Sequence, residues 1–274
     1  MTPQDFANLA DLVRRRSGLV LTPEKKTLAG NRLAPVARRF GFRNTTQLLA
    51  ELPYPSEELA RAITEALTTN DTQFFRDSAV FHFLSHEALP ALLRHRSVTK
   101  RIRIWCAAVS TGQEAYSLAT ILDEMQLAAQ GWKIDLIGTD LSESAIARAK
   151  EGVYAPYEIE RGLPSHVLER YFVEEGKKWR VADRLRRMVT FRAFNLLDHF
   201  GWLGEIDIVL CRNVLIYFEP GTRNEIHGKL REALAPDGYL ILGDTESSIG
   251  HFAPARSVRG LYVNPRGLQR RAAG

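Results

Sequence analysis

The 274-residue sequence predicts an α/β protein in which a small all-helical N-terminal domain precedes a doubly wound α/β domain. Residues 1–76 place apolar side chains at helical spacing and contain no strand pattern. After residue 100, short apolar runs alternate with helical patterns, which is typical of βαβ units around a parallel sheet. Residues 171–189 fit neither pattern and are expected to form an inserted small antiparallel β-subdomain. We therefore expect two domains, 1–76 with its linker and 77–274.

Four helices are expected in the N-terminal domain. The first buries a stripe that begins at Phe6, and the second begins at Thr22-Pro23, a favourable cap and first turn. Pro35 falls inside the second helix and predicts a kink or break there. The fourth is capped by Ser56. The expected ranges are 5–16, 23–41, 45–52 and 56–67.

The second domain is expected to begin with a long helix, 79–94, that starts after Asp77. Strands are expected at 101–107, 134–139, 189–194, 206–211 and 239–243. Helices are expected at 114–129, 142–151 and 220–234, the last ended by the turn signal Pro236-Asp237-Gly238. Inside the inserted segment, short strands are expected at 172–173, 179–181 and 188–189. Residues 266–274 are expected to be disordered.

Composition indicates an ordinary soluble globular protein, with 45% hydrophobic and 25% charged residues. No apolar run approaches the ~20 residues that cross a bilayer, and the first residues lack the order of a secretory signal. Cys106 and Cys211 are too few for a disulfide framework and have no partner at zinc-ligand spacing. We expect reduced, buried thiols in a cytoplasmic protein, with no membrane insertion and no metal site.

The net charge of +5 favours acidic partners. The basic excess is concentrated in the first fifty residues, at Arg14, Arg15, Arg16, Lys25, Lys26, Arg32, Arg38, Arg39 and Arg43, with a second cluster at residues 177–187. A solvated surface explains any one of these residues, whereas the N-terminal group as a whole favours a partner-binding role. Nucleic acid is not the expected partner, because no aromatic residues interleave the basic ones and no nucleic-acid motif occurs.

Three unusual strings separate this chain from a generic α/β protein. Residues 68–77 read TTNDTQFFRD, residues 105–117 read WCAAVSTGQEAYS, and residues 210–218 read LCRNVLIYF. Taken alone, the first string could simply cap the helix that follows it. In this order and at these separations, the three strings resemble the chemotaxis receptor glutamate O-methyltransferases, the CheR family. The resemblance runs from about Phe6 to about Val263.

The chain also predicts a nucleoside pocket from its own residues. The loop 107–112, which follows the first expected strand, is built of small residues ending at Gly112, so that a ligand can approach the backbone. It is neither a G-x-G-x-x-G nor a Walker A sequence, so phosphate binding is not indicated. Asp140 ends the second strand, where an acid accepts the two ribose hydroxyls of an adenosine ligand, although it could instead cap the next helix. These features fit an S-adenosylmethionine methyltransferase.

The resemblance implies a role for each residue of the site. Arg76 orients the incoming carboxylate and Tyr217 lies beside the transferring methyl group, so these two are the catalytic candidates. Asp140 binds the ribose and Glu114 lies near the methionine amino group. The cofactor S-adenosyl-L-methionine, or its product S-adenosyl-L-homocysteine, is implied to contact Asn70, Thr72, Arg76, Glu114, Asp140, Asn195, Leu196, Arg212 and Asn213, with Asn195 and Leu196 flanking the adenine.

The implied reaction is methylation of glutamate side chains on the cytoplasmic helices of methyl-accepting chemotaxis receptors, with the basic N-terminal helices docking on the receptor. Two residues depart from the usual family string Gly-Glu-Glu-Pro-Tyr-Ser, namely Gln113 and Ala115, and they put the shape of this loop in question. Some relatives are tethered by a peptide at the receptor's C-terminus. The short segment 174–178, with its single Gly176, predicts that this chain does not use such a tether. The rivals are a methyltransferase acting on nucleic acid or a small molecule, and a non-catalytic cofactor-binding regulator.

Overall fold

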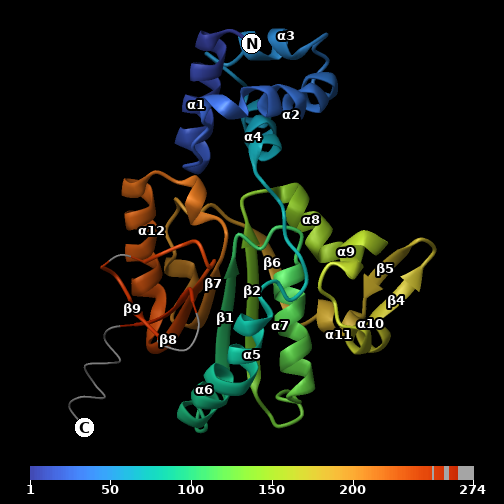
Figure 1. The fold of residues 1–274 in the computed structure, drawn as a ribbon, viewed down its shortest axis with the longest axis vertical. Helices are drawn as coiled ribbons and strands as arrows, with labels where there is room; N and C mark the ends of the chain where they lie inside the picture. Colours follow the sequence, from blue (N-terminus) through green and yellow to red (C-terminus); the bar gives the residue numbers. More distant parts are fainter. Residues whose placement is uncertain (249, 256–258, 265–274) are drawn as a thin grey trace.

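The computed structural model describes residues 1–248, 250–255 and 259–264. A helical N-terminal part stands above a larger sheet-containing part, joined to it by one extended segment that follows α4 (Figure 1). The helical part packs around one cluster of buried apolar side chains. Its helices are α1 (Pro3–Ser17), α2 (Lys26–Arg39), α3 (Thr45–Ala50) and α4 (Glu57–Leu67), with a short 3-10 turn, η1 (Pro23–Lys25), before α2. The expected all-helical N-terminal domain is confirmed.

Of the kink or break expected at Pro35, the break is wrong, because α2 continues through Pro35 to Arg39. Pro35 lies on the exposed side of the helix, so that the carbonyl it leaves without a backbone partner can face water. On the opposite side, Leu33 and Val36 are buried and hold the helix in register. The predicted helix cap at Ser56 is confirmed, since the Ser56 side chain accepts the backbone N–H of Leu59 at the start of α4.

The expected long helix 79–94 is a helical run divided into α5 (Ser78–Phe83), a π-helical turn η2 (Leu84–Ala88) and α6 (Leu89–His95). Pro90 stands in the first turn of α6 and has no N–H to donate, which explains why the ladder is widened just before it. The run still buries Val80, Leu84 and Leu89 on one side. The prediction was therefore right about the path of the chain and wrong about its regularity.

The described residues form a sheet in the order β6-β2-β1-β7-β8-β10-β9. Five strands are parallel, β1 (Arg101–Ala107), β2 (Lys133–Asp140), β6 (Val189–Ala193), β7 (Ile206–Cys211) and β8 (Leu234–Leu242), and β10 (Leu261–Val263) runs antiparallel to β8 and pairs with β9 (Ala253–Pro254). The strand order reverses between β1 and β7, which is where a doubly wound sheet binds its ligand.

Alternate residues of β1 enter two different cores. Ile102, Ile104 and Cys106 pack on the face that carries α5, α6 and α7 (Gln113–Glu124), whereas Trp105 and Ala107 pack on the opposite face with α12 (Pro220–Ala233). Helix α8 (Glu143–Glu151) follows β2 and packs against β6. This two-sided burial is the reason the strands read as continuous apolar runs.

Two elements in this domain have boundaries that differ from expectation by several residues. Helix α7 ends at Glu124 rather than Ala129. Strand β8 begins at Leu234, so Pro236-Asp237-Gly238 lies within the strand rather than in a turn after α12. The β7–β8 register explains this, because Ile206 faces Leu234 and Ile208 faces Tyr239, which leaves the proline segment in a bulge. Strands β9 and β10 were not anticipated, since each is at most three residues long.

A separate three-stranded antiparallel sheet has the order β3-β5-β4, formed by β3 (Val153–Tyr154), β5 (Lys178–Val181) and β4 (Phe172–Glu175). It confirms the inserted β-subdomain, but the expected strand at Met188-Val189 is wrong, since Val189 begins β6 of the large sheet. The third strand comes instead from residues 153–154. Helices α9 (Pro156–Glu160), α10 (Ser165–Tyr171) and α11 (Asp183–Arg186) complete this part. The expected disorder of residues 266–274 falls outside the described residues.

Within the described chain, no helix is both long and apolar enough to cross a membrane. Cys106 and Cys211 are free and buried, and burial raises the pKa of both thiols well above the ordinary value. Both therefore belong to the core as small apolar side chains.

Candidate functional site

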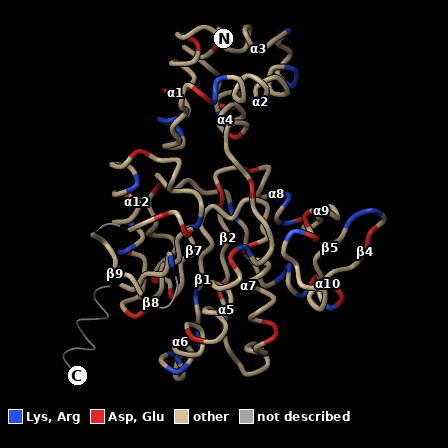
Figure 2. Tube along the Cα trace, viewed as in Figure 1, with Lys and Arg blue, Asp and Glu red and all other residues tan. Residues whose placement is uncertain are grey.

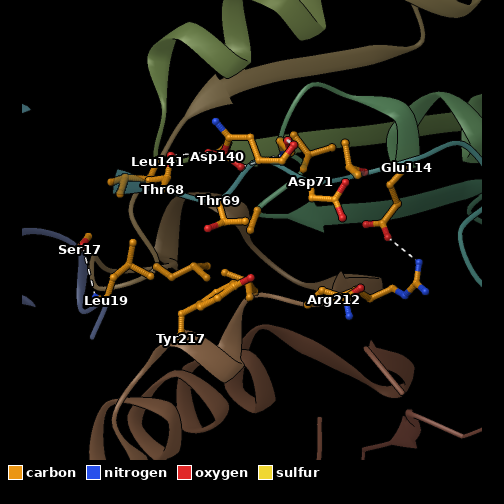
Figure 3. Close-up of a pocket in the computed structure, with 18 of the residues that line it drawn as sticks. Ser17, Leu19, Thr68, Thr69, Asp71, Glu114, Asp140, Leu141, Arg212 and Tyr217 are labelled. Carbon is orange, nitrogen blue, oxygen red and sulfur yellow. Dashed lines mark hydrogen bonds and ion pairs between the residues drawn. The ribbon is translucent and has the colours of Figure 1, made fainter. Parts of the chain in front are cut away.

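A pocket opens at the carboxyl ends of β1, β2 and β7, beneath the extended segment that joins the two parts (Figure 3). It encloses about 910 Å³ of space free of protein atoms, part of it open to solvent. Every residue that the sequence nominated lines this pocket: Asn70, Thr72, Arg76, Glu114, Asp140, Asn195, Leu196, Arg212, Asn213 and Tyr217. They come from segments up to 147 positions apart (217 − 70), so the fold alone brings them together.

Residues 68–77, which we call the strap, are fastened at several points along their length. Phe74 is buried between the rings of Tyr154 and Phe172, at centroid distances of 5.0 and 5.4 Å. The Phe75 backbone N–H donates to the Ser117 hydroxyl (2.9 Å), and the Ser110 hydroxyl donates to the Asn70 carbonyl (3.1 Å). The paired aromatic residues thus anchor the strap to the small sheet and to α7, and its polar residues are left to face the pocket.

Backbone strain is concentrated around the same pocket. Phe75, Asp77, Ala108, Ser110 and Asn213 all have φ between 46° and 59°. Residues other than glycine seldom adopt this conformation, which costs of order 1 kcal/mol or more each. The loop after β1 and the strap therefore hold geometries that the chain would not adopt for packing alone, which indicates a binding site.

Asp140 is buried at the end of β2 and is oriented by two backbone donors. Its carboxylate accepts the N–H of Ser110 (2.8 Å) and of Ser142 (2.9 Å). Burial raises the pKa of Asp140 above its ordinary value, and these two hydrogen bonds offset only part of that rise. The helix-cap alternative for Asp140 is wrong, because Ser142 is the N-cap of α8 and its hydroxyl accepts the N–H of Ala145. Each Asp140 oxygen keeps acceptor capacity for a ligand hydroxyl.

A buried cation lies between two acids at the floor of the pocket. The Arg212 side chain is only 2% exposed, donates to Glu114 at 2.9 Å and forms a second ion pair with Asp77 of the strap. Burial raises the pKa of Glu114, while the charge and hydrogen bond of Arg212 lower it. Of the capping considered for residues 68–77, the structure shows none by the Asp77 side chain, which occupies the N-cap position of α5 but accepts no backbone N–H there. The Arg212 Nε is buried with no hydrogen-bond partner in the described structure.

Arg76, which also lines the pocket, differs from Arg212 in having no acidic partner in the part of the chain that the structure describes. Its one side-chain hydrogen bond among the described residues is to the Asp71 carbonyl, at 3.4 Å, and it makes no ion pair with any described carboxylate. It is half-buried in the pocket wall. The guanidinium is therefore available to a carboxylate brought in by a ligand.

Asn195 is engaged in a way that the sequence did not suggest. Its amide nitrogen donates to the Arg16 carbonyl at the end of α1 (2.7 Å), and its amide oxygen accepts the Leu197 N–H (3.0 Å). The side chain thus ties the helical part to the end of β6. Its backbone, with that of Leu196, is what remains to border the pocket.

Tyr217 lies on the wall opposite Thr69 and Asp71 (Figure 3). Its carbonyl accepts the Val20 N–H at 2.9 Å, and the Lys25 ammonium stands 5.1 Å from its ring centroid. The ring also borders a neighbouring groove lined by Leu28 and other residues of the helical part. Tyr217 therefore stands where the pocket meets the N-terminal helices.

Sequence reasoning missed Glu246 as a residue that shapes the site. Its buried carboxylate accepts five backbone N–H groups at 2.7–3.3 Å, from Asn213, Val214, Leu215, Ile216 and Gly243. These hydrogen bonds hold the loop that places Asn213 and Tyr217. A Cβ at Gly243 would stand 2.7 Å from the Asn213 amide, so only glycine fits there. The run 243–247 resembles the family's, which was the one available signal.

The departures at Gln113 and Ala115 keep the loop intact. The Gln113 amide accepts from the Thr111 hydroxyl (2.8 Å) and donates to Glu158 (3.3 Å). A glutamate at 113 would set two carboxylates against each other, although Arg148 also binds Glu158. Ala115 is fully buried in the sheet core, and α7 begins directly after Gly112 without needing proline. A glutamine at position 113 therefore fits between the Thr111 hydroxyl and the Glu158 carboxylate.

The lining has a donor set that matches S-adenosylmethionine part by part. Glu114 suits an ammonium group, Arg76 suits a carboxylate, and the oriented Asp140 suits a ribose diol. Among the described residues, no group of three or more His, Cys, Asp or Glu side chains could hold a metal ion. The fold and the pocket together define a methyltransferase that uses S-adenosylmethionine.

Family models agree with this class. The CheR methyltransferase SAM binding domain matches residues 70–258, and the CheR methyltransferase all-alpha domain matches residues 4–68. The chain belongs to the CheR methyltransferase family. Chemotaxis protein methyltransferase 1 of Pseudomonas aeruginosa is 36% identical over 247 residues, covering 89% of this chain and 90% of that protein. Chemotaxis protein methyltransferase Cher2 of Pseudomonas putida is 35% identical over 251 residues, covering 90% and 91%.

Proposed function

We propose that this protein transfers the methyl group of S-adenosylmethionine to glutamate side chains on the cytoplasmic helices of chemoreceptors, forming methyl esters, and that it acts in the cytoplasm. The observation that supports this most directly is the gathering of all ten nominated residues around one pocket that meets the N-terminal helices at Tyr217. The similarity to chemotaxis protein methyltransferases supports the choice of acceptor. We retain 1–76 and 77–274 as the proposed domains.

In this proposal, different pocket residues bind different parts of the cofactor. Asp140 binds the ribose hydroxyls, Glu114 binds the methionine ammonium, and Asn195 and Leu196 flank the adenine through their backbone and the Leu196 side chain. Asn70, Thr72 and Arg76 contact the methionine part from the strap, and Arg212 and Asn213 form the floor. Bound there, the cofactor supplies an activated methyl group on its sulfonium.

The chain's own residues have a modest chemical task. A glutamate acceptor is already ionised at neutral pH, so no general base is required. Arg76 orients that carboxylate, and Tyr217 packs beside the point of transfer. Holding two reactants in line can contribute about 7–11 kcal/mol towards lowering the barrier. Proximity and alignment, supplied by the strap and by the Tyr217 loop, are thus the protein's main contribution.

The decisive test is incubation with methyl-labelled cofactor and receptor signalling fragments, followed by alkaline treatment. Methyl esters release labelled methanol under base, whereas methylated amines and nucleic acids retain the label. Label that stays on the fragments, or enters added nucleic acid instead, would overturn the glutamate assignment.

Arg76→Ala is expected to lower turnover by about ten- to a hundredfold, because the incoming carboxylate loses its orienting cation. The Arg76 side chain has no ion pair among the described residues to lose, so the melting temperature should change little. Steady-state methyl transfer and thermal melting would be measured together. Arg161→Ala, which removes a strap contact to Asp71 outside the pocket, is the matched control. A wild-type rate for Arg76→Ala would remove it from the mechanism.

The basic N-terminal surface is less free than the sequence suggested. Arg14 and Arg15 pair with Asp11, Arg16 pairs with Glu57, and Arg39 pairs with Glu58 at 3.5 Å. Blue positions nevertheless occur at several places on the helical part, with red positions among them (Figure 2). Among the described carboxylates, none forms an ion pair with Lys26, Arg38 or Arg43. Docking on an acidic receptor helix therefore remains our proposal for the end of α2.

Reversing Arg38 and Arg39 to glutamate is expected to weaken receptor binding at low salt by about tenfold or more, with cofactor affinity unchanged. Electrostatic docking is screened by ions, so added salt should reduce the difference between parent and variant. Reversal of Arg14 and Arg15 carries the same charge change on α1 and serves as control. Equal receptor affinity of the Arg38/Arg39 variant and the parent at low salt would contradict the docking surface.

We further propose that no C-terminal receptor tether is used, and the support for this comes from the short turn of the small sheet rather than from the basic residues beside it. Lys178 and Arg180 lie on the central strand β5, not on an edge, and the edge strand β4 ends in Glu174 and Glu175. The turn between the strands is tight and has a single glycine, Gly176, at φ 63°. Titration of the purified protein with the receptor's C-terminal peptide should show no binding up to millimolar concentration. Micromolar binding would show the opposite.

A further inference from the structure

We propose that Asp77 sets the charge balance of the pocket floor, so that Glu114 can bind the ammonium group of the cofactor's methionine part. Asp77 is outside the set of residues nominated from the sequence. The inference rests on the proposed site, in which Glu114 meets that ammonium, and it adds a positioning residue that selects for an amino group.

The first step is the contact pattern. Arg212 is held between Asp77 of the strap and Glu114 in the first turn of α7, and its side chain is 2% exposed. The Glu114 side chain is 13% exposed and the Asp77 side chain 41%. The guanidinium is thus removed from water, whereas the outer acid reaches the surface. A pair of Glu114 and Arg212 alone would be buried and electrically neutral.

The second step is the sum of charges. Glu114 and Arg212 contribute −1 and +1, so this pair has no net charge that would attract a cationic ligand. Asp77 brings the group of three to −1. Because Arg212 divides its donors between two acids, Glu114 keeps acceptor capacity and negative potential towards the pocket. Half-buried Arg76 lines the same pocket and brings the sum of the four charges to zero, whereas without Asp77 the other three would carry +1.

The third step is the backbone of Asp77. It adopts φ 59°, directly after Arg76, and its side chain caps no helix. Aspartate tolerates this conformation better than most residues, and its side chain, which makes no cap hydrogen bond, has Arg212 as its partner. The left-handed backbone of Asp77 thus accompanies the placement of a second acid beside the buried Arg212.

The test is calorimetric binding of two ligands to the parent, Asp77→Asn and Asp71→Asn. The ligands are S-adenosylhomocysteine and its deaminated analogue, which lacks the amino group and keeps the carboxylate. Asp77→Asn preserves shape and a carbonyl acceptor for Arg212 but removes the charge. Asp71→Asn is the matched control, since Asp71 lies on the same strap and lines the same pocket but pairs with exposed Arg161.

For Asp77→Asn, we expect S-adenosylhomocysteine to bind about five- to tenfold more weakly and the deaminated analogue to bind equally well or better. Asp71→Asn should leave the ratio of the two affinities near that of the parent. Equal weakening of both ligands by Asp77→Asn would show a purely structural role and overturn the inference alone. A parent protein that does not bind S-adenosylhomocysteine would overturn the proposed site together with it.

Discussion

Glu246→Ala is expected to reduce methyl transfer by roughly a hundredfold or more, because a misplacement of about 1 Å at a site that works by alignment has an effect of that size. Removal of this carboxylate leaves five backbone N–H groups without their acceptor. The loop that places Asn213 and Tyr217 would then lose its fixed geometry. Turnover with a saturating acceptor and cofactor is the measurement.

Two further variants separate this effect from general destabilisation. Glu246→Gln keeps one carbonyl acceptor and should retain more activity than the alanine variant. Glu225→Ala, at an exposed position on α12, removes a glutamate without touching the site and should have the parent's rate. Cofactor affinity should fall far less than turnover, since Glu114 and Asp140 come from other segments. A folded Glu246→Ala protein with the parent's rate would contradict a role for this carboxylate.

The sequence could predict the site because its residues cluster in short strings. Asn70 and Arg76 share one string, and Arg212 and Tyr217 share another, so the residues that line each wall are nearly contiguous. Glu246 was missed because four of its five partners lie 30–33 residues away and all five are backbone N–H groups, which leave no side-chain pattern. The string 68–77 left capping open as an alternative because a cap and an ion pair use the same residue types. Only the fold shows which contact is made.

The fold was predictable to a similar depth. The parallel strands were found because short apolar runs that alternate with helical patterns are distinctive. Strand β3 has two residues and is defined by pairing with β5, so its own sequence contains no period to detect. The same holds for β9 and β10. Pro35 and Pro90 show that the effect of a proline on a helix cannot be read from the sequence alone, because it depends on whether water or packed side chains surround the proline.

A second large effect is expected at Arg96, at the end of α6, where Arg96→Met should lower the free energy of unfolding by about 3–5 kcal/mol. Arg96 donates to Asp207 at 2.8 and 3.1 Å and to Asp237 at 2.6 and 2.9 Å. The Asp207 side chain is 8% exposed, so the variant leaves a buried carboxylate without its cation. Since each kcal/mol moves the melting temperature of a chain this long by ~2–4 °C, calorimetry should show a drop on the order of 10 °C.

Arg101→Met is the control, because Arg101 likewise forms an ion pair, with Asp135, but its side chain is 47% exposed. Exposed pairs contribute at most about 1 kcal/mol, so this variant should lose far less stability. A loss no larger for Arg96→Met than for Arg101→Met would contradict the assignment of a buried network.

Acid adds an independent signature of the same network. Burial raises the pKa of Asp237, but hydrogen bonds from Arg96 and His95 and the charge of Arg96 outweigh it, and the pKa falls to about 2. A folded pKa below the ordinary 3.8 means that this stabilisation is present above about pH 4 and is lost as the pH falls through 2. Arg96→Met removes the cause of the low pKa. The variant's free energy of unfolding should therefore depend less steeply on pH between 4 and 2 than the parent's, and parallel curves would show that Arg96 is not what stabilises the Asp237 carboxylate.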